Sequence, residues 1–143
     1  ISWTFNPEKN RNLPVDVTFL EFDELLATSD VISLHTALSN ETKYLIGKRE
    51  LSLMKPEAIL INGSRGGVID TDALVDALTR QKLYGAGLDV FETEPPTNSE
   101  LIKLKNLIAT PHIGAQIIEA QKDASIVIAQ KIIKYYSDNP SKE

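Results

Sequence analysis

Apolar runs alternate with amphipathic stretches along most of the chain, and most runs end at a glycine, a proline or a polar turn. Short apolar runs predict buried strands, whereas apolar residues spaced three or four apart predict helices. The predicted strands are 2–5, 31–34, 58–61, 83–90 and 107–110. The predicted helices are 21–28, 47–54, a helix capped by Asp70, and 117–136.

Strands that alternate with helices predict an α/β fold, with parallel strands and helices packed on the faces of the sheet. Ligands of such sheets bind at the carboxyl ends of the strands. Several chemically versatile residues closely follow a predicted strand: Asn6, His35, Arg65, Asp89 and His112. Their shared position indicates a ligand site at one edge of the sheet.

The composition narrows the range of functions. The chain has 143 residues, enough for one domain, with a charged fraction of 24% and a formal net charge of −5. A negative charge with scattered lysines and arginines argues against a nucleic-acid partner. The sequence contains no cysteine, which excludes disulfides, thiolate catalysis and cysteine zinc sites. Its apolar runs are too short for a bilayer and no signal segment opens it, so we expect a soluble, cytoplasmic protein without a metal site.

Three side chains in the predicted loops could carry chemistry. Arg65 precedes a glycine pair that lets the backbone approach a ligand, and its guanidinium could hold a carboxylate with two hydrogen bonds. His112 suits proton transfer near neutral pH. Glu94 beside it would orient the imidazole and favour its protonated form. Taken singly, each of these residues also has a non-catalytic interpretation. Arg65 could be a loop arginine paired with a surface acid, His112 a structural hydrogen-bonding residue, and Glu94 a solvated acid.

Three successive motifs resemble the signatures of the D-isomer-specific 2-hydroxyacid dehydrogenases. They are NGSRGGVID at 62–70, GAGLDVFETEP at 85–95 and TPHIGA at 110–115. The stretch SLHT at 33–36, with Thr42, resembles the part of that family that passes along the cofactor. The resemblance covers nearly all of residues 1–136, in the family's order and with comparable spacing.

The resemblance implies an NAD-dependent oxidoreductase that acts on the CH–OH group of a D-2-hydroxy acid and, in reverse, reduces the 2-keto acid. Arg65 matches the arginine that binds the carboxylate of the substrate. Glu94 and His112 match the acid–imidazole pair, in which His112 takes or delivers the proton. His35 matches a position near the active site, and Asp89 matches a carboxylate near the nicotinamide amide.

The resemblance also implies a set of cofactor contacts: Asn6, His35, Thr36, Ala37, Asn62, Gly63, Ser64, Asp89, His112 and Gly114. The family often has proline where this chain has Ala37, a departure that concerns loop shape. NAD-preferring enzymes usually carry an acid at the position of Asn6, where it repels a 2′-phosphate. With Lys9 and Arg11 close by, we expect NADP to be tolerated alongside NAD; the alternative is a neutral turn residue with two solvated cations.

The fold that the family implies is a Rossmann-like, doubly wound parallel sheet in the order 3-2-1-4-5-6. The sequence lacks the glycine-rich turn that follows the first strand of such a sheet. We therefore interpret residues 1–143 as the C-terminal portion of the nucleotide-binding domain, without its first strand and without the substrate domain. If 1–5 is strand 2 and 58–61 is strand 4, two edges stay unpaired and apolar helix faces stay exposed. The isolated chain is then not expected to fold as a native-like monomer.

Two other functions stay open at this point. A dinucleotide-sensing corepressor of the same fold would also keep Arg65, Glu94 and His112. An inactive remnant would be favoured if the glycine-rich strand were missing from the whole protein. The fragment by itself is expected to be inactive. The family is usually dimeric through this domain, so we expect a homodimer of the full-length protein, with a small 2-hydroxy or 2-keto acid as its substrate.

Overall fold

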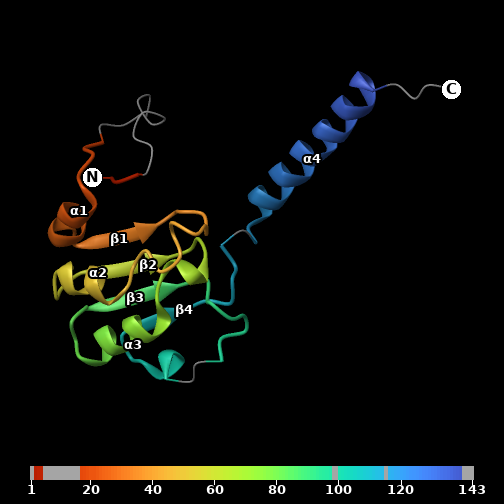
Figure 1. Cartoon of the computed structure of the whole chain (residues 1–143). Coiled ribbons are helices and arrows are strands. Elements are labelled where there is room, and N and C mark those ends of the chain that lie inside the picture. The colour runs from red at the N-terminus through yellow and green to blue at the C-terminus, as the bar shows by residue number, and fades with distance from the viewer. Residues whose placement is uncertain (1, 5–16, 98–99, 115, 140–143) are drawn as a thin grey trace. The chain divides into compact units, whose positions relative to one another are not determined.

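The computed structural model describes residues 2–4, 17–97, 100–114 and 116–139. The chain divides into two compact units, Ile1–Pro111 and His112–Glu143. The first unit contains a sheet with helices α1 to α3, and the second contains helix α4 (Figure 1). Each unit is described by itself.

Within the described part of the first unit, four parallel strands form one sheet in the order β1-β2-β3-β4. The strands are β1 (Val31–Leu34), β2 (Ile59–Asn62), β3 (Gly85–Leu88) and β4 (Leu107–Ala109). Leu34 pairs with Asn62, Asn62 with Leu88, and Leu88 with Ala109. The carboxyl ends of the four strands therefore form one row, and the predicted α/β fold with parallel strands is confirmed.

Helix α1 (Phe22–Thr28) precedes β1. Helix α2 (Lys48–Leu53) connects β1 to β2, and helix α3 (Thr71–Thr79), after a 3-10 turn at Gly66–Val68, connects β2 to β3. A second 3-10 turn, Leu101–Lys103, precedes β4. Helices α2 and α3 lie on one face of the sheet (Figure 1). The hydrophobic core lies between these helices and that face. Its largest fully buried side chains are Leu26, Ile46, Leu60, Val68, Leu74, Leu78, Leu83 and Leu101.

The predicted helix starts agree with the observed caps. Asp70 is the N-cap of α3, and its carboxylate accepts a hydrogen bond from the backbone nitrogen of Ala73 at 3.1 Å. Strand β3 is shorter than the predicted 83–90 because burial continues beyond the paired residues. Leu83 and Val90 are both buried, yet both lie outside the strand.

The predicted strand 2–5 is not a strand in the described residues. Ser2 forms an isolated parallel bridge with Phe19, through bonds from Ser2 N to the Thr18 carbonyl at 2.8 Å and from Leu20 N to the Ser2 carbonyl at 3.0 Å. Phe5 lies outside the described residues. One bridge is too little for a ladder, so this apolar stretch packs through its side chains instead, with the Trp3 and Phe22 rings 4.6 Å apart between centroids.

The position predicted for strand 4 is also corrected. The segment 58–61, most of which forms β2, does not border the position of the missing first strand. Strand β1 pairs with β2 and lies at the edge of the sheet instead. Apolar side chains are exposed on the sheet away from α2 and α3: Val31 is 56%, Ile61 39% and Ile108 76% exposed. The expected exposure concerned apolar helix faces, whereas these three side chains belong to strands β1, β2 and β4. The folding of the isolated chain stays a prediction.

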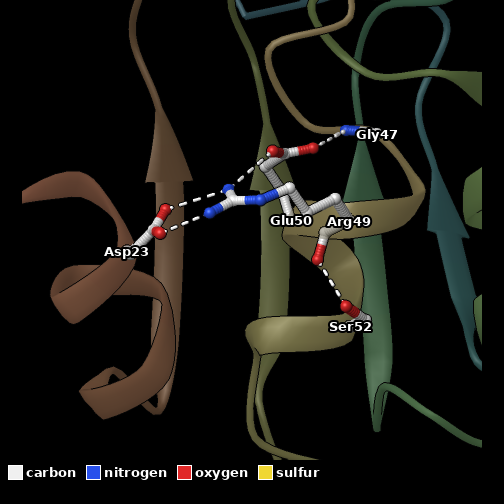
Figure 2. Close-up of polar contacts among 5 residues, drawn as sticks. All are labelled: Asp23, Gly47, Arg49, Glu50 and Ser52. Carbon is white, nitrogen blue, oxygen red and sulfur yellow. Dashed lines mark hydrogen bonds and ion pairs between the residues drawn. The ribbon is translucent and has the colours of Figure 1, made fainter.

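An ion-pair network joins α1 to the start of α2 (Figure 2). The guanidinium of Arg49 holds both carboxylate oxygens of Asp23 and lies 3.1 Å from Glu50 Oε1. Glu50 also accepts a hydrogen bond from the backbone nitrogen of Gly47 at 3.1 Å, which caps α2. The hydrogen bond between Arg49 and Asp23 lowers the pKa of the Asp23 carboxyl group and raises the pKa of the Arg49 guanidinium. The exposed network sets the approach of two helices, and solvent screens its contribution to stability.

The second unit consists of a turn and the long helix α4 (Ile118–Asp138), which was predicted at 117–136. The helix has apolar residues at helical spacing but no buried residue. Among the described residues, no helix has the length and apolar character needed to cross a membrane.

Candidate active site

The candidate residues of the first unit gather at the carboxyl ends of the strands, as predicted. His35, Thr36 and Ala37 follow β1, Asn62 ends β2 and is followed by Gly63, Ser64 and Arg65, and Asp89 follows β3. Because Leu34, Asn62 and Leu88 pair in one row, the structure brings these loops to one edge of the sheet. Asn6 lies outside the described residues, and His112 and Gly114 belong to the second unit.

The side chain of Asn62 builds the turn that carries Arg65. Asn62 is 1% exposed, and its amide nitrogen donates to the Arg65 carbonyl at 2.9 Å. Its amide oxygen accepts from the backbone nitrogen and the hydroxyl of Ser64, at 3.0 and 2.9 Å. Arg65 itself is exposed, with one guanidinium nitrogen 2.6 Å from the Ser64 carbonyl. The hydrogen bonds of Asn62 therefore hold the turn that carries Arg65, and one guanidinium nitrogen of Arg65 is engaged within the same turn.

The position of Gly66 requires a glycine because the backbone of another loop lies very close to it. The close neighbour is therefore the protein itself and not a ligand. A Cβ atom at Gly66 would lie 1.9 Å from the carbonyl carbon of Phe91 and 2.4 Å from the backbone nitrogen of Glu92. The turn after β2 and the loop after β3 thus touch backbone to backbone. This contact links the loop of Arg65 to the loop of Glu94.

The loop after β3 is held at several points. The Thr110 hydroxyl donates to Asp89 Oδ1 at 2.5 Å, and the backbone nitrogen of Asp89 donates to the Asn62 carbonyl at 2.9 Å. Glu94 is exposed, and its Oε1 accepts from the backbone nitrogen of Phe91 at 3.1 Å. Asp89 therefore ties the start of this loop to the end of β4, two residues before His112.

Sequence reasoning missed Glu92, which makes two polar contacts outside this loop. Its Oε1 accepts from the backbone nitrogen of Thr71 at 2.9 Å, and its Oε2 accepts from the Tyr44 hydroxyl at 3.0 Å. The available signal was a second acid two residues before Glu94. Nothing in the spacing reveals that this acid reaches residues 21 and 48 positions away.

The loop after β1 contains a hydroxyl that fits a ligand. His35 Nε2 lies 2.9 Å from the Ser33 hydroxyl. Thr42 shapes the loop by donating to the Ala37 carbonyl at 2.6 Å and accepting from the Ser39 backbone nitrogen at 2.7 Å. The Thr36 hydroxyl oxygen is buried and has no hydrogen-bond partner among the described residues. An unpaired buried hydroxyl costs free energy, so a bound polar group would satisfy it.

In the second unit, His112 lies in a tight turn before α4. Its φ is 55°, in the left-handed region, and its carbonyl accepts from the Gln116 side-chain nitrogen at 3.2 Å. His112 and Gly114 are exposed. The pairing of His112 with Glu94 stays a prediction.

Comparison with known proteins decides the family. The family model described as D-isomer specific 2-hydroxyacid dehydrogenase, NAD binding domain, matches residues 2–114. The chain belongs to the D-isomer specific 2-hydroxyacid dehydrogenase family. The match covers the loops of Arg65, Glu94 and His112, and it confirms the resemblance, the Rossmann-like α/β fold and NAD as the cofactor of the family.

Two curated relatives of this dehydrogenase domain are a glyoxylate reductase and a D-3-phosphoglycerate dehydrogenase. The chain is 48% identical over 134 residues to the glyoxylate reductase of Thermococcus litoralis, covering 94% of the chain and 40% of that protein. It is 50% identical over 123 residues to D-3-phosphoglycerate dehydrogenase of Escherichia coli, covering 82% of the chain and 30% of that protein. The chain therefore spans less than half the length of these curated relatives.

A solved structure extends the comparison to the fold. An acyclic imino acid reductase in complex with NADPH and D-arginine matches with a TM-score of 0.84 and 32% identity, covering 93% of the chain and 42% of that structure. The residues of the dehydrogenase domain fit a dinucleotide on two observations. The Thr36 hydroxyl lacks a partner within the described residues, and a Cβ at Gly63 would meet nothing within 4 Å, so this edge has an open approach.

Proposed function

We propose that the complete protein is an NAD(P)-dependent dehydrogenase that oxidises the CH–OH group of a D-2-hydroxy acid and reduces the 2-keto acid in reverse. One observation carries the proposal. The loops of Arg65 and Glu94 meet through the contact of Gly66 with Phe91, at the carboxyl edge of a parallel sheet in this family. The activity, the substrate and the partners of the whole protein are part of this proposal.

Arg65 is proposed to bind the carboxylate of the substrate. Its guanidinium has five N–H donors in a planar fork, of which one is engaged with the Ser64 carbonyl. Two parallel bonds to a carboxylate fix the orientation of an acid more firmly than a single lysine contact would. The buried side chain of Asn62 supports this role because it holds the Arg65 backbone. Holding the acid in one orientation lowers the barrier by pre-organisation.

His112 and Glu94 are proposed to handle the proton. In the oxidation, His112 takes the hydroxyl proton while the C–H bond of the same carbon breaks; in the reduction, it returns the proton to the keto oxygen. A nicotinamide cofactor, when bound, would accept the hydride in the oxidation and supply it in the reduction. Glu94 is proposed to accept a hydrogen bond from the second ring nitrogen of His112, which orients the ring and stabilises its charged form.

The cofactor is proposed to lie along the loops after β1, β2 and β3. The Thr36 hydroxyl, the open space at Gly63 and the backbone of Ala37 are available to it. Asn62 is proposed to act indirectly, since its amide is occupied within its own turn. Further contacts are proposed for His35, Ser64, Asp89, His112 and Gly114. The neutral Asn6 supports use of NADP beside NAD, and the related imino acid reductase was solved with NADPH.

The experiment that tests this function is turnover by the complete protein with a panel of 2-keto acids. The panel contains glyoxylate, hydroxypyruvate, pyruvate and 3-phosphohydroxypyruvate, with NADH or NADPH consumption as the readout. We expect the complete protein to turn over at least one of these acids. We also propose that the complete protein is a homodimer and that it is located in the cytoplasm. Tight NADH binding without turnover of any acid would contradict the enzymatic function and favour a dinucleotide-sensing protein.

A further inference from the structure

The loop after β3 carries two glutamates whose carboxylates serve different partners. Glu94 folds back on the backbone nitrogen of Phe91 at 3.1 Å, so its position follows that of the loop. Glu92 instead reaches two segments outside the loop, through the Thr71 backbone nitrogen and the Tyr44 hydroxyl. The position of Glu94 therefore depends on what holds Glu92.

The first partner of Glu92 is a fixed point of the fold. Thr71 is the first residue of α3. The N-cap residue Asp70 accepts a hydrogen bond from the backbone nitrogen of Ala73. The backbone nitrogen of Thr71 is one of the donors that a helix leaves without an intrahelical partner. A carboxylate at this end of a helix is also favoured by the helix dipole. Glu92 thereby attaches the loop after β3 to the rigid start of α3.

The second partner connects the loop to the neighbourhood of Arg65. Tyr44 has a φ of 54°, and its backbone nitrogen donates to the Gly67 carbonyl at 2.9 Å. Gly67 lies two residues after Arg65. Through the Tyr44 hydroxyl, Glu92 is thus linked to the same turn that carries Arg65.

The charge of Glu92 is matched to this role. Burial by itself would raise its pKa, but the hydrogen bonds from Thr71 and Tyr44 and the charge of Lys43 outweigh burial and hold the pKa of Glu92 below its ordinary value. The same bond raises the pKa of the Tyr44 hydroxyl, so Tyr44 stays a donor. An ionised acceptor between two neutral donors makes stronger hydrogen bonds than a neutral one.

We propose that Glu92 is a positioning residue for the reaction: it fixes the loop after β3 to α3 and to Tyr44, and so sets the place of Glu94 relative to Arg65. This inference rests on the proposed function of Glu94. The contact of Gly66 with Phe91 fixes the loop just before Glu92, and the Glu92 carboxylate adds two further attachments one residue later. Removal of Glu92 leaves the fold and the first contact in place and lets Glu94 move.

A double-mutant cycle in the complete protein tests the proposal. We expect Glu92→Ala to lower kcat about tenfold, Tyr44→Phe to lower it less, and Glu92→Gln to recover part of the loss because it keeps an acceptor for Thr71. In a Glu94→Gln background, Glu92→Ala is expected to lower kcat by less than about twofold, because it acts through Glu94. The matched control is Glu57→Ala, an exposed glutamate in the turn after α2, which should leave kcat unchanged.

The pH profile distinguishes positioning from general loss of stability. If Glu92 acts through the proposed role of Glu94, Glu92→Ala and Glu94→Gln should both change the same limb of the kcat/KM profile in the same direction. Additive effects of the two substitutions, or a profile that moves only in Glu94→Gln, would overturn the proposal.

Amide hydrogen exchange gives a second readout that does not need turnover. Exchange at Thr71 and in the segment 89–97 should become faster in Glu92→Ala and not in Glu57→Ala, while β2 keeps its protection. Unchanged exchange at Thr71 would overturn the inference whatever the kinetics. If the wild type turns over no 2-keto acid, the proposed function fails, and exchange still decides whether Glu92 holds the loop.

Discussion

Substitution of Gly66 tests how the two proposed catalytic loops are held together. The Cβ atom of alanine would lie 1.9 Å from the Phe91 carbonyl carbon and 2.0 Å from its oxygen. The loop after β3 would have to move by about 1.5 Å to reach an ordinary contact distance of 3.4 Å. Because both sides of the contact are backbone, no side-chain rotation relieves it. Overpacking of this kind lowers stability by about 1–3 kcal/mol.

Gly66→Ala should lower the catalytic efficiency as well as the stability. A displacement of about 1 Å at a catalytic group can lower the rate about a hundredfold, so we expect a loss of kcat/KM of that order. The assays are the Tm of the complete protein and kcat/KM for its best 2-keto acid. Gly63→Ala, in the same turn, is the matched control for Tm, because its Cβ would meet nothing within 4 Å. A Gly66→Ala protein with wild-type Tm and kcat/KM would refute the described contact.

Three further predictions address single residues. Asn62→Ala should destabilise the complete protein by about 1–3 kcal/mol in denaturant unfolding, because it leaves buried polar groups of the turn unpaired. The control substitution Ser52→Ala, at an exposed residue, should not destabilise it. An unchanged denaturation midpoint in Asn62→Ala would contradict the role of Asn62. Because the pKa of Glu92 is lowered, its ionised bonds stabilise the fold above the ordinary value of 4.5 and are lost as the pH falls through the lowered value. The Tm difference between wild type and Glu92→Gln should therefore shrink in acid, and a difference that is constant with pH would count against it. For the cofactor, kcat/KM with NADP should lie within about tenfold of that with NAD, and Asn6→Asp should shift the ratio toward NAD; a wild-type preference for NAD of about a thousandfold would disprove the reading of Asn6.

Local signals in the sequence were enough for most elements of the fold. Strand 31–34 is bounded by polar residues and was predicted at its observed limits, and Asp70 was recognised as a cap because its contact with Ala73 is local. Strand β3 was predicted too long, since Leu83 and Val90 are buried without pairing. Apolar character reports burial, whereas strand limits depend on which backbone groups find a partner.

Contacts between distant segments could not be predicted in the same way. The edge position of β1 follows from pairing across the sheet, and the sequence alone pointed to 58–61 instead. The sequence predicts that the glycine pair after Arg65 makes room for a ligand, but the group close to Gly66 is the backbone of Phe91. Glu92 looked like a neighbour of Glu94 because its two partners come from other parts of the chain. The residues with proposed catalytic roles were found through motifs, and the residues that position them were found through geometry.

The most direct test of the proposed reaction is kcat of the complete His112→Ala protein with its best 2-keto acid, measured beside NADH binding to the same protein. If His112 moves the proton, kcat should fall by about a hundredfold or more while the affinity for NADH changes little. Glu94→Gln should retain more activity with a shifted pH profile. A His112→Ala protein that binds NADH and keeps the wild-type kcat would contradict the mechanism.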